Sequence, residues 1–263
     1  MKKALLAAAS VALLGAQAFA QMPDNSICPD WTGTDLNGRS HNLYSYLDSG
    51  YTVFIDVSAT WCGPCWSYHN SGALEGLYNT YGPGTAQNKV RVFFIEGDAS
   101  TTLADLQGTG PSTQGNWIAG TPYPIIDNAS IGNLLQITYF PTIYKVCPNR
   151  VITLVGQKTT AQLWATVGSC QAAVEGNDAT LLPAMGSIRG CAGSPVALTA
   201  RLQNLGSQPL TSATIEAKQG STVLGSTNWT GDLPRYGVAN VNVASFTPTG
   251  NVSVTLNITT PDA

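Results

Sequence analysis

Charged residues are scarce in this 263-residue chain, since only 10% of its residues are Asp, Glu, Lys or Arg. Soluble domains contain roughly 25%. Such a composition excludes a basic tail for nucleic acid, a polybasic patch for a membrane surface and an acidic disordered tail. We therefore expect no nucleic-acid partner.

Long apolar runs are scarce as well. Two lysines at positions 2 and 3 precede the single apolar run Ala4–Gly15, and Ala18–Ala20 reads AFA. A basic start, a short apolar stretch and an A-x-A site predict a signal peptide over 1–20, with cleavage before Gln21. A membrane anchor is the alternative, but the run is shorter than the roughly 20 residues of a spanning helix. We expect an exported bacterial protein, periplasmic or extracellular, without an integral membrane segment after cleavage.

The 27 glycines and 15 prolines are dispersed without a period, which excludes collagen and low-complexity linkers and indicates many turns. Acidic residues outnumber basic ones twelve to six over 21–180, whereas 181–263 holds three acidic and four basic residues. The asymmetry and the length predict two domains. We expect them at 21–172 and 187–263, joined by a linker at 173–186.

The first of these segments alternates between strand-like and helix-like stretches. The expected strands are Val53–Val57, Lys89–Ile95, Pro124–Asp127, Thr142–Val146 and Val151–Val155. The expected helices are Cys65–Tyr78, Ser100–Leu106, Ser130–Ile137 and Thr160–Cys170. This alternation predicts an α/β fold with a mixed sheet flanked by helices, the last two strands forming an antiparallel hairpin. The turn-rich stretch Trp31–Leu47 predicts a small hairpin before the first core strand.

Beyond residue 187 the apolar residues alternate with polar ones, as in a half-buried strand. The alternating positions are Val196, Leu198, Ala200 and Leu202, then Val238, Val241 and Val243, and finally Val252, Val254, Leu256 and Ile258. Turns are expected at Asn204–Gly206 and Thr230–Asp232. Short strands without helices predict a small all-β sandwich.

The sequence WCGPC at 61–65 lies between a buried strand and a helix. A helix N-terminus stabilises a thiolate on its first cysteine, here Cys62. Pro64 suits the first helical turn, where its missing N–H is not needed. The two-residue spacing lets Cys65 resolve a mixed disulfide formed on Cys62. A redox dithiol is therefore the favoured interpretation.

Three other kinds of cysteine site are alternatives to a redox dithiol at Cys62 and Cys65. A zinc site needs two more ligands, but the other cysteines are scattered and both histidines, His41 and His69, are isolated. A purely structural disulfide remains open. A peroxidatic cysteine usually has Thr or Ser three residues earlier, where this chain has Ala59.

Residues 25–170 resemble the thioredoxin superfamily, in particular its exported branch of TlpA-like thiol-disulfide oxidoreductases. The WCGPC motif matches that signature in full. Asp56 stands six residues before Cys62, where the family carries a buried acid, and Phe140-Pro141-Thr142 resembles its cis-proline loop. The stretch 29–38, PDWTGTDLNG, resembles the N-terminal hairpin of that branch.

The resemblance, with the chemistry above, implies a role for each site residue. Cys62 attacks protein disulfides, and Cys65 resolves the intermediate and is the more buried thiol. Asp56, if buried, has a raised pKa and exchanges a proton with Cys65; a capping or surface acid is the alternative. Pro141 exposes backbone polar groups to an extended substrate, although an ordinary trans proline is the commoner case. Trp61 shields the dithiol or belongs to the core.

The implied partners are protein thiols and disulfides and an unidentified electron donor, with no prosthetic group. A Gly-Pro pair between the cysteines is that of thioredoxin, a reductant, so reduction or isomerisation is favoured over oxidation. Phe140 stands where the family usually has a smaller residue before Pro141, which leaves substrate preference open.

The C-terminal segment resembles Ig-like, CARDB-type modules of secreted bacterial proteins, through Leu202–Gly206 and Leu210–Ala213. This leaves a second interpretation of the whole chain. It would be a secreted binding or adhesion protein that uses the thioredoxin fold as a scaffold.

The remaining cysteines favour one structural disulfide. The strand after Cys147 runs away for about 16 Å, and the helix ending at Cys170 returns by about 15 Å. We therefore expect a Cys147–Cys170 bond, which requires a Cα separation below about 7 Å. Cys28 and Cys191 either pair with each other or stay reduced and buried. His69, one turn after Cys65, is interpreted as a packed or surface residue rather than one that tunes the dithiol.

Overall fold

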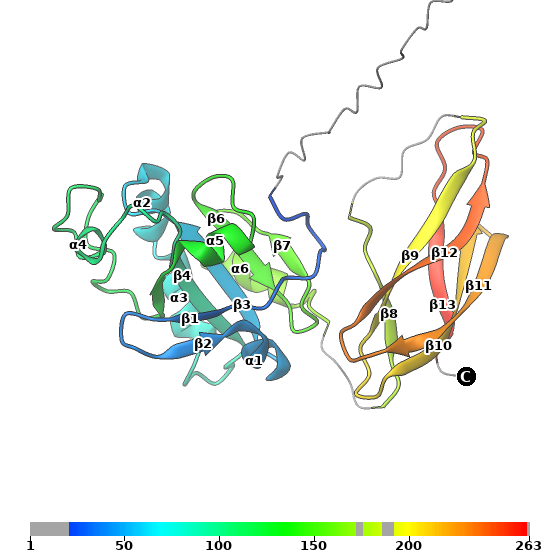
Figure 1. Ribbon diagram of the computed structural model, residues 1–263, viewed down its shortest axis with the longest axis horizontal. Helices are drawn as coiled ribbons and strands as arrows, with labels where there is room; N and C mark the ends of the chain where they lie inside the picture. The colour runs from blue at the N-terminus through cyan, green and yellow to red at the C-terminus, as the bar shows by residue number, and fades with distance from the viewer. Residues whose placement is uncertain (1–20, 172–175, 186–191, 262–263) are drawn as a thin grey trace, which may run out of the picture.

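The computed structural model describes residues 21–171, 176–185 and 192–261. It shows an α/β part followed by an all-β part (Figure 1). The signal peptide expected at 1–20, and Cys191, lie outside the described residues. In the described part of the chain, no helix is long and apolar enough to cross a membrane.

The α/β part is built on one five-stranded sheet, in the order β5-β4-β3-β6-β7. Its strands are β3 (Thr52–Ser58), β4 (Val90–Glu96), β5 (Ile125–Asp127), β6 (Thr142–Val146) and β7 (Ile152–Leu154). Strands β3, β4 and β5 run parallel, whereas β6 is antiparallel to β3 and to β7. All seven residues of the central strand β3 are buried, as its apolar run predicts. The expected mixed sheet is confirmed.

Helices cover both faces of this sheet. They are α1 (Leu43–Asp48), α2 (Gly63–His69), α3 (Ala73–Tyr81), α4 (Leu103–Leu106), α5 (Ala129–Leu134) and α6 (Thr160–Val167). Buried side chains of α2, α3 and α6 share one core with Phe54 of β3. Those of α1 and α5 share the other core with Val53 and Ile55. Successive side chains of β3 thus point to opposite faces of the sheet, and helices pack on both sides of the strand that leads to Cys62.

Two expectations for this part need correction. The single helix expected over Cys65–Tyr78 is wrong, because the chain breaks between α2 and α3, where Gly72 adopts a left-handed φ of 70°. The N-terminal hairpin forms between β1 (Thr32–Thr34) and β2 (Ser40–Asn42), but it stops earlier than expected. Asn42 caps the unexpected helix α1 by accepting a bond from the backbone N–H of Ser45 at 2.9 Å.

The all-β part is a sandwich of two three-stranded sheets, β11-β10-β13 and β12-β9-β8. Its strands are β8 (Ala179–Leu182), β9 (Val196–Asn204), β10 (Leu210–Gln219), β11 (Thr222–Leu233), β12 (Val238–Phe246) and β13 (Thr255–Pro261). One apolar core joins the sheets. The turn expected at Thr230–Asp232 is wrong, since these residues continue β11. Strand β8 lies inside the expected linker and pairs with β9.

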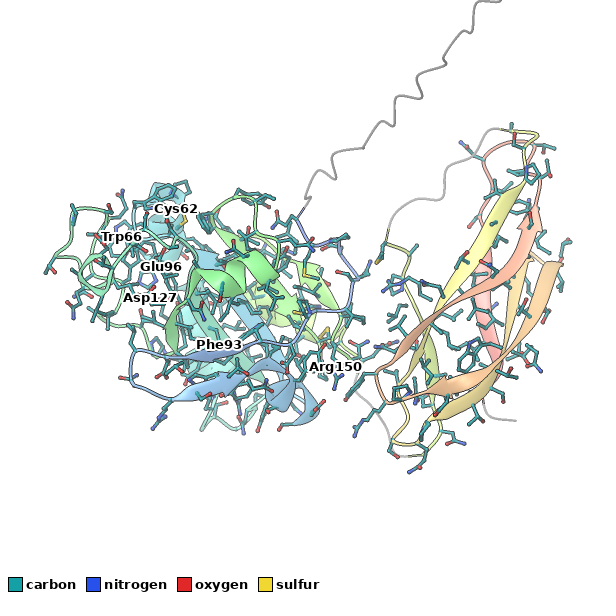
Figure 2. The ribbon with its side chains drawn as sticks, in the orientation of Figure 1. Cys62, Trp66, Phe93, Glu96, Asp127 and Arg150 are labelled. Atoms are coloured by element: carbon teal, nitrogen blue, oxygen red, sulfur yellow. A yellow bond between two sulfur atoms is a disulfide. The ribbon has the colours of Figure 1, made fainter. Side chains whose placement is uncertain are left out.

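The sandwich contacts the hairpin β6–β7, at the end of the α/β part away from Cys62 (Figure 2). Buried Asn149 donates to Gln203 Oε1 at 3.1 Å, and Gln203 Nε2 donates back to the Asn149 carbonyl at 2.9 Å. The Arg150 guanidinium lies 4.8 Å from the ring centre of Tyr236. The sandwich therefore leaves the dithiol end of the α/β part uncovered.

The expected Cys147–Cys170 disulfide is confirmed, with a Cα separation of 5.2 Å. Cys28 is a buried free thiol, and burial raises its pKa to about 12. The bonded Cys147 and Cys170 offer no thiol, and the Cys28 thiol stays protonated near neutral pH, so these three cysteines do not compete with Cys62 and Cys65 as nucleophiles.

Candidate active site

The dithiol lies where β3 gives way to α2. Cys62 and Cys65 form a disulfide with a Cα separation of 5.3 Å. Cys62 is the N-cap of α2, and its sulfur accepts a hydrogen bond from the backbone N–H of Cys65 at 3.2 Å. Pro64 occupies the first turn, as expected. This N–H and the helix dipole favour a negative charge on the Cys62 sulfur.

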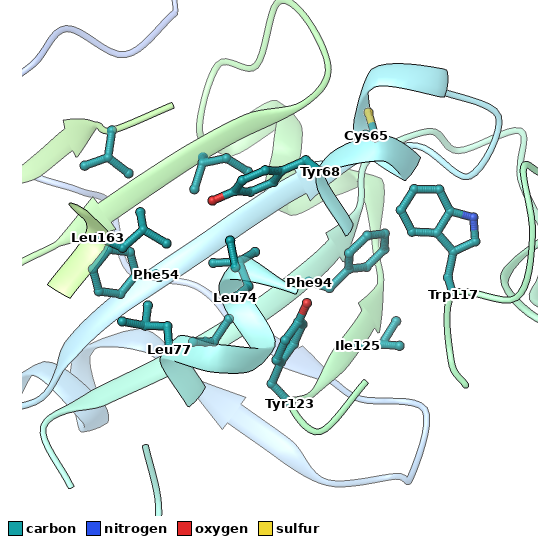
Figure 3. Close-up of a cluster of buried hydrophobic side chains, with 14 of the residues drawn as sticks. Phe54, Cys65, Tyr68, Leu74, Leu77, Phe94, Trp117, Tyr123, Ile125 and Leu163 are labelled. Atoms are coloured by element: carbon teal, nitrogen blue, oxygen red, sulfur yellow. The ribbon is translucent and has the colours of Figure 1, made fainter. Parts of the chain in front are cut away.

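Both cysteines are shielded, Cys65 at 1% exposure and Cys62 at 4%. Both belong to an apolar core that also contains Phe94, Trp117 and Tyr123, and Figure 3 shows these three rings near Cys65. Cys65 is the more buried thiol, as expected for the resolving position.

Asp56 projects from β3 into the same core and is buried, at 1% exposure. Its Oδ1 accepts a bond from Ser58 Oγ at 2.6 Å, while its Oδ2 has no partner among the described residues. Burial, and to a smaller extent the Glu75 charge, raise the Asp56 pKa from 3.8 to about 7 despite the opposing hydrogen bond from Ser58. The alternative of a surface or capping acid is thus excluded.

Two more titratable groups share this interior. His69 Nδ1 lies 3.8 Å from Glu75 Oε1, to which the Tyr123 hydroxyl donates at 3.4 Å. The His69 ring stacks on Trp66 with centroids 5.4 Å apart, and burial lowers its pKa. Burial raises the pKa of Glu75. His69 is therefore a packed residue, as its interpretation from sequence favoured.

A groove of about 340 Å³ opens beside Cys62. Its lining residues are Trp61, Cys62, Ile137, Thr138, Tyr139 and Phe140. The Phe140–Pro141 peptide is cis, as the resemblance implies. The structure thus brings together the motif and residues 137–140, which directly precede Pro141 and lie far from the motif in the sequence.

Trp61 does not belong to the core, since 46% of it is exposed. Its indole Nε1 donates to Asp98 Oδ2 at 2.7 Å. Its ring meets that of Phe140 edge-on, with centroids 6.2 Å apart. Trp61 therefore forms one wall of the groove beside Cys62.

Glu96, at the end of β4, is a further candidate residue that sequence reasoning missed. It is fully buried, and its two carboxylate oxygens accept the backbone N–H groups of Thr60 at 2.9 Å and Asp98 at 3.0 Å. Glu96 thereby connects the loop at Thr60, directly before the motif, to the loop at Asp98, whose side chain accepts the hydrogen bond of the Trp61 indole. Burial raises the Glu96 pKa to about 7. The one signal for Glu96 in the sequence is its position, since this acid directly follows the apolar strand predicted to end at Ile95.

Replacing Glu96 by Gln is expected to lower the free energy of unfolding by about 1–3 kcal/mol at about pH 5, because an amide nitrogen cannot accept the second backbone N–H. The deficit should narrow as the pH rises from about 4.5 to about 7 and then stay constant, because over that range the unfolded wild-type chain has lost the Glu96 proton that the native state still holds. Urea unfolding of the oxidised protein at about pH 5 and about pH 8 measures both effects. The exposed Asp232→Asn serves as control. A deficit that widens with pH would contradict the raised pKa.

Within the described residues, no three His, Cys, Asp or Glu side chains come together as a metal site. The search of protein-family models and the search of curated proteins return no match for the chain.

Solved structures resemble the chain over little more than half its length. A thioredoxin-family thiol:disulfide interchange protein from Chlorobium tepidum is 16% identical, with a TM-score of 0.41, over 57% of this chain and 98% of its own. The thioredoxin domain of a thiol-disulfide oxidoreductase from Bacteroides vulgatus is 18% identical, with a TM-score of 0.39, over 56% and 97%. An exposed lipoprotein thioredoxin from Streptococcus pneumoniae is 19% identical, with a TM-score of 0.39, over 54% and 99%.

Proposed function

We propose that the chain is an exported thiol-disulfide oxidoreductase, periplasmic or extracellular, that exchanges disulfides with proteins through Cys62 and Cys65. The observation that carries the proposal is the pair itself. Cys62 caps a helix and is bonded to Cys65 in its first turn, with the Cys65 N–H directed at the Cys62 sulfur and an open groove beside it.

The two thiols of Cys62 and Cys65 carry the electron transfer in this proposal, without a prosthetic group. In the reducing direction, the Cys62 thiolate attacks a substrate disulfide, forms a mixed disulfide and releases one substrate thiolate. Cys65 then loses its proton and attacks the Cys62 sulfur, which expels the second substrate thiolate. The substrate gains two electrons, and the protein is left with the Cys62–Cys65 disulfide. A donor dithiol must return two electrons before the next cycle.

Asp56 is suited to the proton step. Its pKa of about 7 allows it to accept a proton from Cys65 in the reducing direction and to return one in the oxidising direction. Pro141 and Trp61, in the two loops that meet at Cys62, would align the substrate segment. We also propose that the sandwich is a separate domain of Ig-like type, which begins at β8.

Reduction of insulin, followed by turbidity under a recycling dithiol, tests the proposal. Wild-type protein should accelerate the precipitation of the B chain. Cys62→Ser should return the rate to background, and Cys65→Ser should accumulate a mixed disulfide visible by mass spectrometry. Cys28→Ser, which alters a thiol outside the dithiol site, is the matched control. Wild-type activity at background would reject the enzyme and favour a binding protein built on the same scaffold.

A further inference from the structure

The groove beside Cys62 is lined by aromatic and aliphatic side chains and one threonine, with no charged group among its lining residues. Two of its aromatic residues are unusually open, Trp61 at 46% and Tyr139 at 51% exposure. Exposed aromatic rings gathered on one surface mark a place where another apolar surface binds. Because the Cys62 sulfur is part of the same lining, whatever occupies this groove lies next to the reacting atom.

Phe140 is held in place by a glycine. A Cβ built on Gly97 would lie 2.6 Å from Phe140 Cε1, so only glycine leaves room for this ring. Phe140 also packs against the cores on both faces of the sheet. One wall of the groove is therefore anchored by packing before any substrate arrives.

Trp61 is held by the residues on either side of that glycine. Asp98 accepts the hydrogen bond of the Trp61 indole, and Glu96 accepts the N–H of Thr60, directly before Trp61. The three consecutive residues 96–98 thus position both aromatic walls. A preformed groove of this kind loses little conformational entropy on binding.

A carboxylate borders the groove at Trp61. The Asp98 carboxylate accepts the hydrogen bond of the Trp61 indole, and hydrogen bonds from Ser100 and Trp61 keep the Asp98 pKa below its usual value. An acidic side chain entering the groove would lose hydration next to this charge, whereas an apolar one would gain from burial.

Resting on the proposed function, we propose that the substrates are protein segments with a large apolar or aromatic side chain adjacent to the reacting cysteine. Acidic residues at that position are disfavoured. The preference is set by Phe140, Tyr139 and Trp61, and not by the dithiol itself.

Short peptides that carry one cysteine as a mixed disulfide with glutathione test the inference. The residue next to the cysteine is varied among Phe, Leu, Ser and Asp, and single-turnover reduction by the reduced protein is followed by stopped flow. Each rate is divided by the rate of the same protein variant with bis(2-hydroxyethyl) disulfide, which has no side chain for the groove. We expect the Phe and Leu peptides to react about ten-fold faster than the Ser peptide, with Asp slowest.

Phe140→Ser and Tyr139→Ser should each reduce the ten-fold advantage of the Phe and Leu peptides over the Ser peptide to about two- to three-fold. Tyr139 is half exposed, so its variant remains informative if Phe140→Ser fails to fold. Val223→Ser, at a 50% exposed apolar residue of the sandwich, should leave the advantage of the Phe and Leu peptides unchanged.

Equal wild-type rates for the Phe, Leu and Ser peptides, with normal reduction of the small disulfide, would overturn the groove preference alone. No reduction of either kind of disulfide would instead reject the proposed oxidoreductase function.

Discussion

Replacing Asp56 by Asn is expected to slow disulfide reduction at neutral pH about 100-fold, within the range of general acid–base catalysis. Asn has the size of Asp but accepts no proton from Cys65. The wild-type rate should follow a group with a pKa of about 7. The rate of the variant should rise only at higher pH, where the Cys65 thiol ionises without help.

The same replacement should make the oxidised protein more stable above neutral pH. Asp56 has a pKa of about 7 in the folded state against an ordinary value of 3.8, so between these two values the native state holds a proton that the unfolded chain has lost. The free energy of unfolding of the wild-type protein therefore falls as the pH rises from about 4 to about 7, and it stays lower above that. An asparagine side chain cannot ionise, so the Asp56→Asn variant should lack this loss, which amounts to about 2–4 kcal/mol.

Two measurements separate the roles of Asp56. Stopped-flow reduction of bis(2-hydroxyethyl) disulfide from about pH 5 to about pH 9 gives the rate profile. Urea unfolding over the same range gives stability, and Asp232→Asn, an exposed acid in the sandwich, is the control for both. A variant that is more stable but reacts at the wild-type rate would show that Asp56 is only a buried acid and not the proton acceptor.

Removing the Cys147–Cys170 disulfide as the Cys147→Ala/Cys170→Ala pair is expected to lower the free energy of unfolding by about 3 kcal/mol. The bond closes a loop with a sequence separation of 23 residues, from the end of β6 to the chain just beyond α6. Without it, the unfolded chain regains the freedom of that loop. The edge hairpin and the last helix also lose their covalent tie.

The Cys62→Ser/Cys65→Ser pair provides the matched comparison. It also removes one disulfide, but its sequence separation is only 3, so the entropic loss should be smaller. Denaturant unfolding of both double variants under oxidising conditions measures the difference. A loss for the 147–170 variant no larger than that for the 62–65 variant would contradict a stabilising role for the longer loop.

The central elements could be predicted because they depend on local pattern. The continuous apolar run at 53–57 required a strand buried on both faces, and the structure places β3 there with every residue buried. The 147–170 disulfide followed from strand and helix rise alone. The helix break at Gly72 was missed, because the apolar spacing continues from α2 into α3 on the same face of the sheet.

Other features of the site depend on distant contacts. Glu96 directly follows the strand predicted over Lys89–Ile95, and only the structure shows that it is fully buried, with the loops at Thr60 and Asp98 bonded to it. The sequence favoured Trp61 as a shield for the dithiol and left the core as an alternative, and only the structure shows its indole exposed and bonded to Asp98. Neither outcome follows from residue spacing, because the partners come from different strands.

The sequence by itself determined the dithiol, its place at a helix start, the α/β alternation and the change to short strands after the first part of the chain. These follow from residue order, since periodicity and helix capping act over a few residues. Only the tertiary structure decided which acids are buried and which aromatic rings surround Cys62. Desolvation, and with it the raised pKa values of Asp56 and Glu96, depends on what packs above and below a residue, and segments far apart in the chain supply that packing.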